Sequence, residues 1–164
     1  MDISQLLLII ATFLCTLVAG FVFAFAAVVM PGIRILGDGE FLRAFQVMDG
    51  VIQRGQPAFM AVWVGSTIVL IAAVAVGVGD ADNVGRLLLG AAVVLYLFGV
   101  QLPTVTINIP LNNRVKALEI ASLDATALAE MRTEFEARWN TSNVARTIVA
   151  CVVSLLLLFH LVRI

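Results

Sequence analysis

Several polar side chains near the ends of long apolar segments have types that suit the binding of an anion. Asn108 and Asn112 lie at the end of one apolar run, and Asn143 and Arg146 lie just before another. On a continuous helix, Trp139, Asn143 and Arg146 would share one face. Guanidinium and carboxamide groups donate hydrogen bonds, so together they can hold an oxyanion. Two other roles stay open: Arg146 and Trp139 can anchor at lipid headgroups, and the amides can cap or join helices.

The elements that must position these residues are four uncharged apolar runs, at about residues 6–30, 57–79, 87–109 and 147–162. Each of the first three exceeds the ~20 residues that a helix needs to cross a bilayer. We therefore predict an all-α fold, a transmembrane four-helix bundle. It forms a single membrane-embedded domain over residues 1–164, with spans at about residues 5–30, 57–79, 86–109 and 142–163.

The composition excludes several classes of protein. Apolar residues make up 62% of the 164 residues and charged residues 13%, with a mean hydropathy of +1.07, which favours lipid as the solvent. The net charge of -1 argues against a nucleic-acid partner. Neither Cys15 nor Cys151 is followed by a second ligand at metal-binding spacing, so we expect no metal and no cofactor. We interpret His160, the single histidine, as an interfacial residue without a catalytic role.

The two longer connections each contain an amphipathic pattern. Phe41, Phe45, Met48 and Ile52 recur at helical spacing, and glycines flank them. Residues 123–139 repeat the pattern with Leu128, Met131, Phe135 and Trp139. These segments predict two short interfacial helices, the second of which can continue into the fourth span.

The third and fourth spans carry irregular features near the polar residues. Pro103 should bend the third span and Pro110 should end it. Irregular backbone at membrane depth needs cover from protein or water, so we expect Asn108 to face inward. In the first span, Gly20 and Ala24 predict a close helix contact within the monomer, with a homo-oligomer interface as the alternative.

The distribution of Lys and Arg predicts the orientation. Eight of the ten lie in the first and third connections or at their boundaries, and only Arg86 and Arg163 lie on the other side. By the positive-inside rule, the long connections are cytoplasmic and both termini lie outside. We expect a multi-pass protein of the plasma or bacterial inner membrane.

Five successive segments resemble one known family, the DUF1772 or anthrone oxygenase-like membrane proteins. They are VMPGIR (29–34), FQVMDGVIQ (45–53), PAFMAVWVGST (57–67), TINIPLNNRVKAL (106–118) and RWNTSNVART (138–147). The most specific are the NxPLNN element from Asn108 to Asn113 and the W-N-x-x-N-x-x-R element from Trp139 to Arg146. The family often carries Asn where this chain has Asp49.

The resemblance implies a four-span bundle and, in fungal members, cofactor-independent oxidation of anthrones to anthraquinones by dioxygen. An anthrone loses a proton readily, so a protein that binds it, takes that proton and stabilises the oxyanion could act as a monooxygenase. The candidate catalytic residues are Arg146, Asn108, Asn143 and Asp49. The candidate substrate-binding residues are Asn112, Asn113, Trp139, Trp63 and Tyr96. Asp49 would serve as the base, with simple solvation as the alternative.

Two other functions stay open at this point. A transporter or a lipid- or small-molecule-binding protein predicts a polar path or a lateral cleft, and the scarcity of acidic residues in the spans argues against transport. A structural or accessory protein predicts that the polar cluster satisfies its own hydrogen bonds and leaves no cavity. The expected partners are membrane lipids and a hydrophobic aromatic small molecule.

Overall fold

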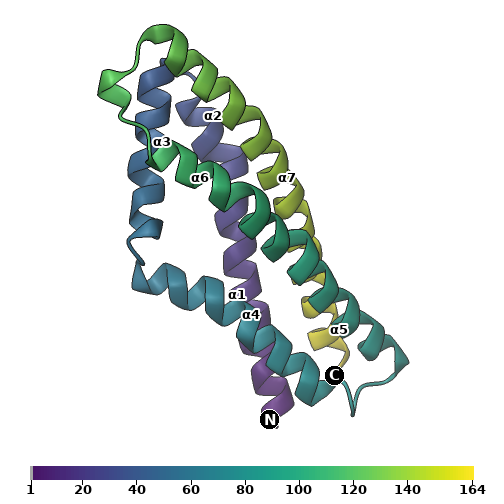
Figure 1. Cartoon of the computed structure of the whole chain (residues 1–164). Helices are drawn as coiled ribbons and strands as arrows, with labels where there is room; N and C mark the ends of the chain where they lie inside the picture. Colours follow the sequence, from purple (N-terminus) through teal and green to yellow (C-terminus); the bar gives the residue numbers. More distant parts are fainter. Residues whose placement is uncertain (1) are drawn as a thin grey trace.

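The computed structural model describes residues 2–164, which form helices joined by short connections and contain no strand. Four of the helices are long and apolar enough to cross a membrane (Figure 1). The first joins α1 (Ile3–Ala24), the π-helical turn η1 (Phe25–Val29) and α2 (Met30–Ile33). The second is α4 (Pro57–Gly77). The third joins α5 (Asn83–Leu95), the π-helical turns η2 (Tyr96–Gln101) and η3 (Thr104–Asn108), and α6 (Ile109–Lys116). The fourth is α7 (Ala125–Arg163). These helices confirm the predicted fold class.

Short polar segments begin the helices. The carboxylates of Asp2, Asp82 and Asp124 accept hydrogen bonds from backbone N–H groups in the first turns of α1, α5 and α7. Pro57 begins α4, where the missing backbone N–H has no energetic cost because the first N–H groups of a helix have no acceptor within it. Gly55, with φ of +74°, makes the turn between α3 (Asp38–Gln53) and α4, because only glycine adopts that conformation without strain.

The spans pack around an apolar core to which α1, α4, α5, η2 and α7 contribute. Two glycines bring the third span unusually close to α7. A Cβ atom on Gly99 would lie 2.7 Å from Val149, and one on Gly85 would lie 2.8 Å from His160. Small residues of this kind let helix backbones approach in lipid, so larger residues at these positions would push the two helices apart.

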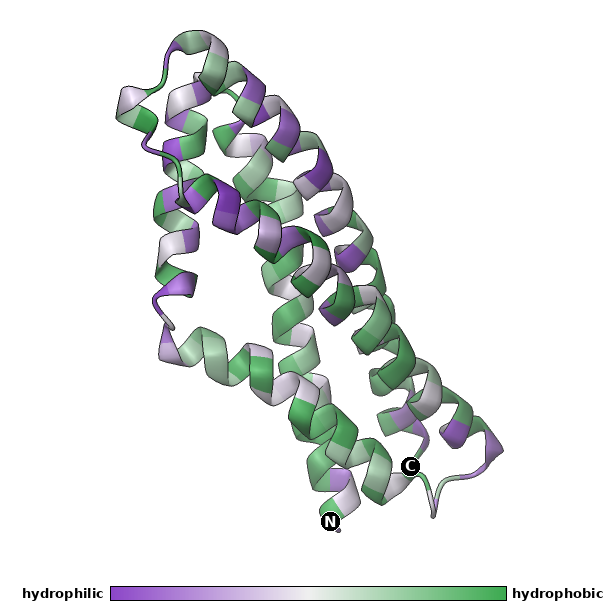
Figure 2. Cartoon of the chain, viewed as in Figure 1, coloured by the Kyte–Doolittle hydropathy of each residue, from purple (hydrophilic) through white to green (hydrophobic). Residues whose placement is uncertain are grey.

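A second apolar cluster lies toward the end of the molecule where α3, α6 and the start of α7 meet. It consists of Met30, Phe41, Leu42, Phe45, Leu111, Val115, Phe135 and Trp139. Figure 2 shows hydrophilic residues concentrated on the outer surfaces of these same helices. The predicted helix around residues 41–52 is α3, and its apolar face packs on α6 and α7. The segment 123–139 forms the first part of α7, which continues without a break into the fourth span.

The third span differs from the sequence prediction at Pro110. The helix does not end there but continues through α6 to Lys116. The two π-helical turns on either side of Pro103 shift the backbone hydrogen bonds by one residue, so the chain accommodates prolines that would otherwise break an α-helix.

In the first span, the close helix contact predicted at Gly20 does not form. Gly20 is exposed, and a Cβ atom there would meet nothing within 4 Å, so Gly20 makes no close contact inside the monomer. The alternative role of this segment in a homo-oligomer stays a prediction.

Candidate functional site

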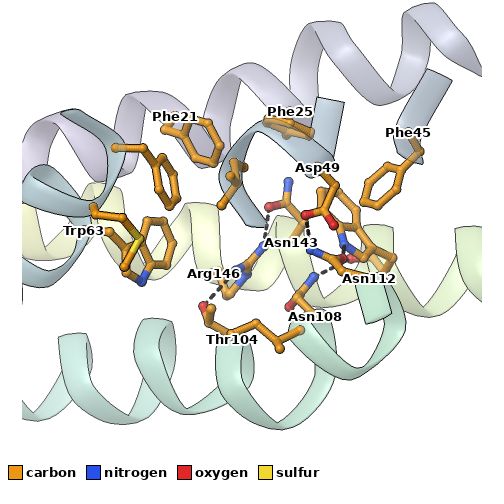
Figure 3. Close-up of a pocket in the computed structure, with 15 residues that line it drawn as sticks. Phe21, Phe25, Phe45, Asp49, Trp63, Thr104, Asn108, Asn112, Asn143 and Arg146 are labelled. Carbon is orange, nitrogen blue, oxygen red and sulfur yellow. Dashed lines mark hydrogen bonds between the residues drawn. The ribbon is translucent and has the colours of Figure 1, made fainter. Parts of the chain in front are cut away.

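A cavity of about 200 Å³ lies where α1, α3, α4, η3, α6 and α7 converge (Figure 3). Its polar side chains are Asp49, Thr104, Asn108, Asn112, Asn143 and Arg146. Its apolar and aromatic side chains are Phe21, Phe25, Phe45, Ile52, Phe59, Met60, Trp63, Ile109 and Trp139. A mainly apolar pocket with a few converging polar groups is the usual form of a small-molecule site.

Arg146 is the cation of this site and is only 4% exposed. Its Nη1 donates to Thr104 Oγ1 at 2.7 Å and its Nη2 donates to Asn143 Oδ1 at 2.8 Å. Its Nε is buried and has no hydrogen-bond partner among the described residues. None of the salt bridges within residues 2–164 involves Arg146. The protein therefore buries a guanidinium whose neighbours are neutral, an arrangement that favours an anionic ligand.

Two amides hold the helices together beside this cation. Asn143 Nδ2 donates to the carbonyl of Val22 in α1 at 3.0 Å, which orients its oxygen toward Arg146. Asn108 Oδ1 accepts from Ser142 Oγ at 2.6 Å, and its Nδ2 donates to the Trp139 carbonyl at 3.5 Å. Both amides are thus fixed by contacts with other helices, and Arg146 is held by a rigid frame.

Asp49 is the acidic group of the site and is 5% exposed. Its carboxylate accepts a hydrogen bond from Asn112 Nδ2 at 2.7 Å and another from Gln53 Nε2. Asn112 in turn accepts from Trp139 Nε1 at 2.7 Å, which fixes the orientation of the amide. Burial raises the pKa of Asp49 above its ordinary value, although both hydrogen bonds and the charge of Lys116 oppose the rise. A raised pKa makes the carboxylate a stronger proton acceptor, as a general base requires.

Aromatic rings form the apolar part of the cavity. Phe59 and Trp63 are stacked with their ring centroids 5.5 Å apart, and Phe21 meets Phe59 edge to face at 5.1 Å. On the other side, Phe25 lies 5.7 Å from Trp139. Flat surfaces of this kind suit a flat aromatic ligand.

Most of the predicted site residues meet at this cavity, namely Arg146, Asn108, Asn143, Asp49, Asn112, Trp139 and Trp63. Two do not line it. Asn113 is exposed on the outer side of α6. Tyr96 is fully buried among the spans, where its hydroxyl pairs with Ser66 Oγ at 2.6 Å.

The site residues predicted from the sequence did not include Thr104 or any of the four phenylalanines that line the cavity. Thr104 precedes Asn108 by four residues and so shares its helix face, a spacing that could have identified it. Phe21 and Phe25 are also four residues apart, yet their spacing alone does not distinguish a cavity wall from ordinary packing.

The single histidine of the chain does not line this cavity. His160 is 6% exposed and borders a separate pocket with Asp2 and Asp80, at the other end of the bundle. Within residues 2–164, no group of three or more His, Cys, Asp or Glu side chains could hold a metal ion.

Comparisons with known proteins identify one family. The sequence model of the family described as anthrone oxygenase matches residues 48–156. That range includes every polar side chain of the cavity. No curated protein and no solved structure matches the chain.

Proposed function

Because this chain belongs to the anthrone oxygenase family, which also carries the name DUF1772, we propose that it oxidises a flat, anthrone-like aromatic molecule with dioxygen. The buried Arg146 is the observation on which this proposal mainly rests. Among residues 2–164 this guanidinium has no carboxylate partner and its Nε is unpaired, and burying such a group is costly unless it serves a ligand. The oxyanion of a deprotonated anthrone would supply the missing negative charge.

The proposed reaction begins with proton transfer. The Asp49 carboxylate removes a proton from the methylene carbon of the substrate, and the electron pair moves onto the carbonyl oxygen. Arg146 stabilises the resulting oxyanion. Asp49 and Arg146 form no salt bridge with each other, so the base is free to accept a proton and the cation is free to hold the anion.

Oxidation then follows from the chemistry of the anion. The anion passes one electron to dioxygen, and the two radicals join through a new carbon–oxygen bond to give a peroxide that takes the proton back from Asp49. Loss of the second methylene proton breaks the oxygen–oxygen bond. One oxygen atom remains as the new carbonyl, and the other leaves as water. The substrate loses four electrons and dioxygen gains four, so the reaction balances without a further reductant.

The alternative of a purely structural protein fits the site less well. A structural cluster would satisfy its own hydrogen bonds and fill its space with side chains. Here the polar groups border a cavity, and the guanidinium keeps an unused donor.

We further propose that the protein lies in a plasma or bacterial inner membrane with its two long connections in the cytoplasm. The excess of Lys and Arg around those connections supports this orientation. In that orientation, Arg146 and Asp49 lie near the cytoplasmic boundary of the bilayer.

The direct test compares oxygen uptake by the wild type and the Arg146→Met variant, purified in detergent and supplied with the anthrone dithranol. We expect kcat to fall about 100- to 1000-fold in the variant, the usual cost of losing one donor to an oxyanion. Methionine keeps a long side chain in the site, and circular dichroism would check that the variant folds.

Arg138→Met is the matched control, because Arg138 lies two turns earlier on α7 and is exposed. It should retain the wild-type rate. Equal rates for wild type and Arg146→Met, after subtraction of the spontaneous oxidation, would contradict the proposal.

A further inference from the structure

The cavity is open on one side, and the residues at its rim are apolar. Met60, in the first turn of α4, is 41% exposed, and Ile109, at the start of α6, is 44% exposed. Ile52 and Phe59 complete this side and are partly buried. All four of these residues are apolar, and exposed apolar surface of this kind marks a membrane-contacting face or a ligand-binding groove.

The helices that carry Met60 and Ile109 separate at this level. In Figure 1, the C-terminal end of α4 lies close to α5. Toward the N-terminal end of α4, the distance to η3 and α6 increases. Both residues belong to segments long and apolar enough to span the membrane. Their exposed neighbours on the same helices, Val64 and Val105, are also apolar. These apolar neighbours favour an opening toward the hydrocarbon of the bilayer rather than toward water.

The size of the cavity limits how much of a ligand it can enclose. An apolar cavity of about 150 Å³ holds a single benzene ring, and this one measures about 200 Å³. A molecule with three fused rings is larger, so part of it must extend beyond the enclosed space. The charged and amide groups lie at the inner end, around Arg146, and the apolar rim lies at the opening.

We propose that the substrate enters sideways from the bilayer, through a portal between Met60 and Ile109, with its oxygen-bearing edge first. The inference rests on the proposed function and adds the route and the substrate class. The substrate is a lipid-dissolved ring system whose far edge stays in the portal. Apolar substituents on that edge are tolerated, and charged ones are excluded.

The two tryptophans of the chain allow a direct test, because Trp63 and Trp139 both line the cavity. Their fluorescence therefore reports on this site alone. The probe is anthraquinone added to phosphatidylcholine vesicles that contain the protein, since quinones quench indole fluorescence on contact. The double variant Met60→Phe with Ile109→Phe narrows the portal with larger rings. The control, Val64→Phe with Val105→Phe, places the same rings one turn away on the same two helices.

We expect saturable quenching whose onset is several-fold slower in the portal variant and unchanged in the control. Met60→Ala with Ile109→Ala should quicken the onset, because this variant removes side-chain atoms from both sides of the portal. Equal onset rates in all variants would overturn the portal, as would an absence of saturable quenching in the wild type. A portal effect without oxidation of dithranol would instead reject the proposed reaction and leave the route intact.

Discussion

Arg146 and Asp49 share one cavity without neutralising each other, and neutral amides keep them apart. Asn112 donates to the Asp49 carboxylate, while Thr104 and Asn143 accept from Arg146. A direct ion pair would fix both charges, and a ligand would then have to break it. The separation leaves one group able to move a proton and the other able to bind an anion, which is the combination that an oxidation through a carbanion requires.

At the residue scale, the raised pKa of Asp49 makes the proposed reaction pH-dependent. Only the deprotonated carboxylate can act as a base, so kcat/KM should rise with pH, with a midpoint above the ordinary aspartate value of 3.8. Asp49→Asn should remove this acidic limb and lower kcat/KM by about 100- to 10,000-fold. The measurement is the pH profile of oxygen uptake. Glu40→Gln, an exposed acid on the same helix, should change neither the rate nor the profile.

The same shift predicts a stability effect with a defined sign. A carboxyl group whose pKa is raised by folding binds its proton more tightly in the folded state, so the free energy of unfolding falls as the pH rises through that pKa. Asp49→Asn cannot ionise and should lose this part of the pH dependence. Chemical unfolding in detergent at a series of pH values would measure it, and an unchanged slope in the variant would contradict the burial argument.

At the element scale, α3 is the helix that completes the site, because it contributes Phe45, Asp49 and Ile52 to the cavity. Its position depends on contacts with α6 and α7. Gln46 Nε2 lies within hydrogen-bond distance of three carbonyls at the end of α6, from Val115, Lys116 and Leu118. The apolar periodicity of α3 predicted the helix and the burial of Phe41 and Phe45, but not the burial of Asp49. A single sequence does not specify which helix covers that face.

The prolines of the third span show a second limit of sequence interpretation. Pro110 is a helix breaker by local rules, yet the helix continues past it. The reason is the π-helical geometry of η3, which includes Asn108 and Thr104 and turns both toward α7. Such turns depend on tertiary contacts, so the spacing of the prolines alone could not predict them.

The docking of α3 should depend strongly on Phe45. Its ring is 1% exposed and lies 4.5 Å from the Phe135 ring and 5.4 Å from the Trp139 ring, centroid to centroid. Phe45→Ala should lower the free energy of unfolding by about 3 to 5 kcal/mol, the usual cost of deleting a buried aromatic ring. Val47→Ala, on the exposed face of the same helix, should change it by about 0.5 kcal/mol or less. Denaturant unfolding in detergent compares the two, and similar losses in both variants would contradict the docking.

At the scale of the whole molecule, the cavity lies between two apolar clusters with different surroundings. One is the core of the spans, and the other lies where α3, α6 and the start of α7 meet beneath hydrophilic outer surfaces (Figure 2). The hydropathy of the sequence predicted the four spans, because length and apolar content decide what crosses a bilayer. The hydropathy could not predict that Tyr96 lies away from the cavity or that Thr104 lines it. Both placements depend on how the spans rotate against one another.

The orientation of the molecule in the membrane can be tested at two exposed acids that lie at opposite ends of the bundle. Asp80 lies in the connection between α4 and α5, and Glu119 lies in the connection between α6 and α7. If the positive-inside rule holds, a membrane-impermeant maleimide added to intact cells should label Asp80→Cys and should label Glu119→Cys only after permeabilisation. The native thiols interfere little, because Cys15 is buried and Cys151 lies within the fourth span. The reverse labelling pattern would contradict the predicted orientation and would place the polar end of the cavity near the outer side of the membrane.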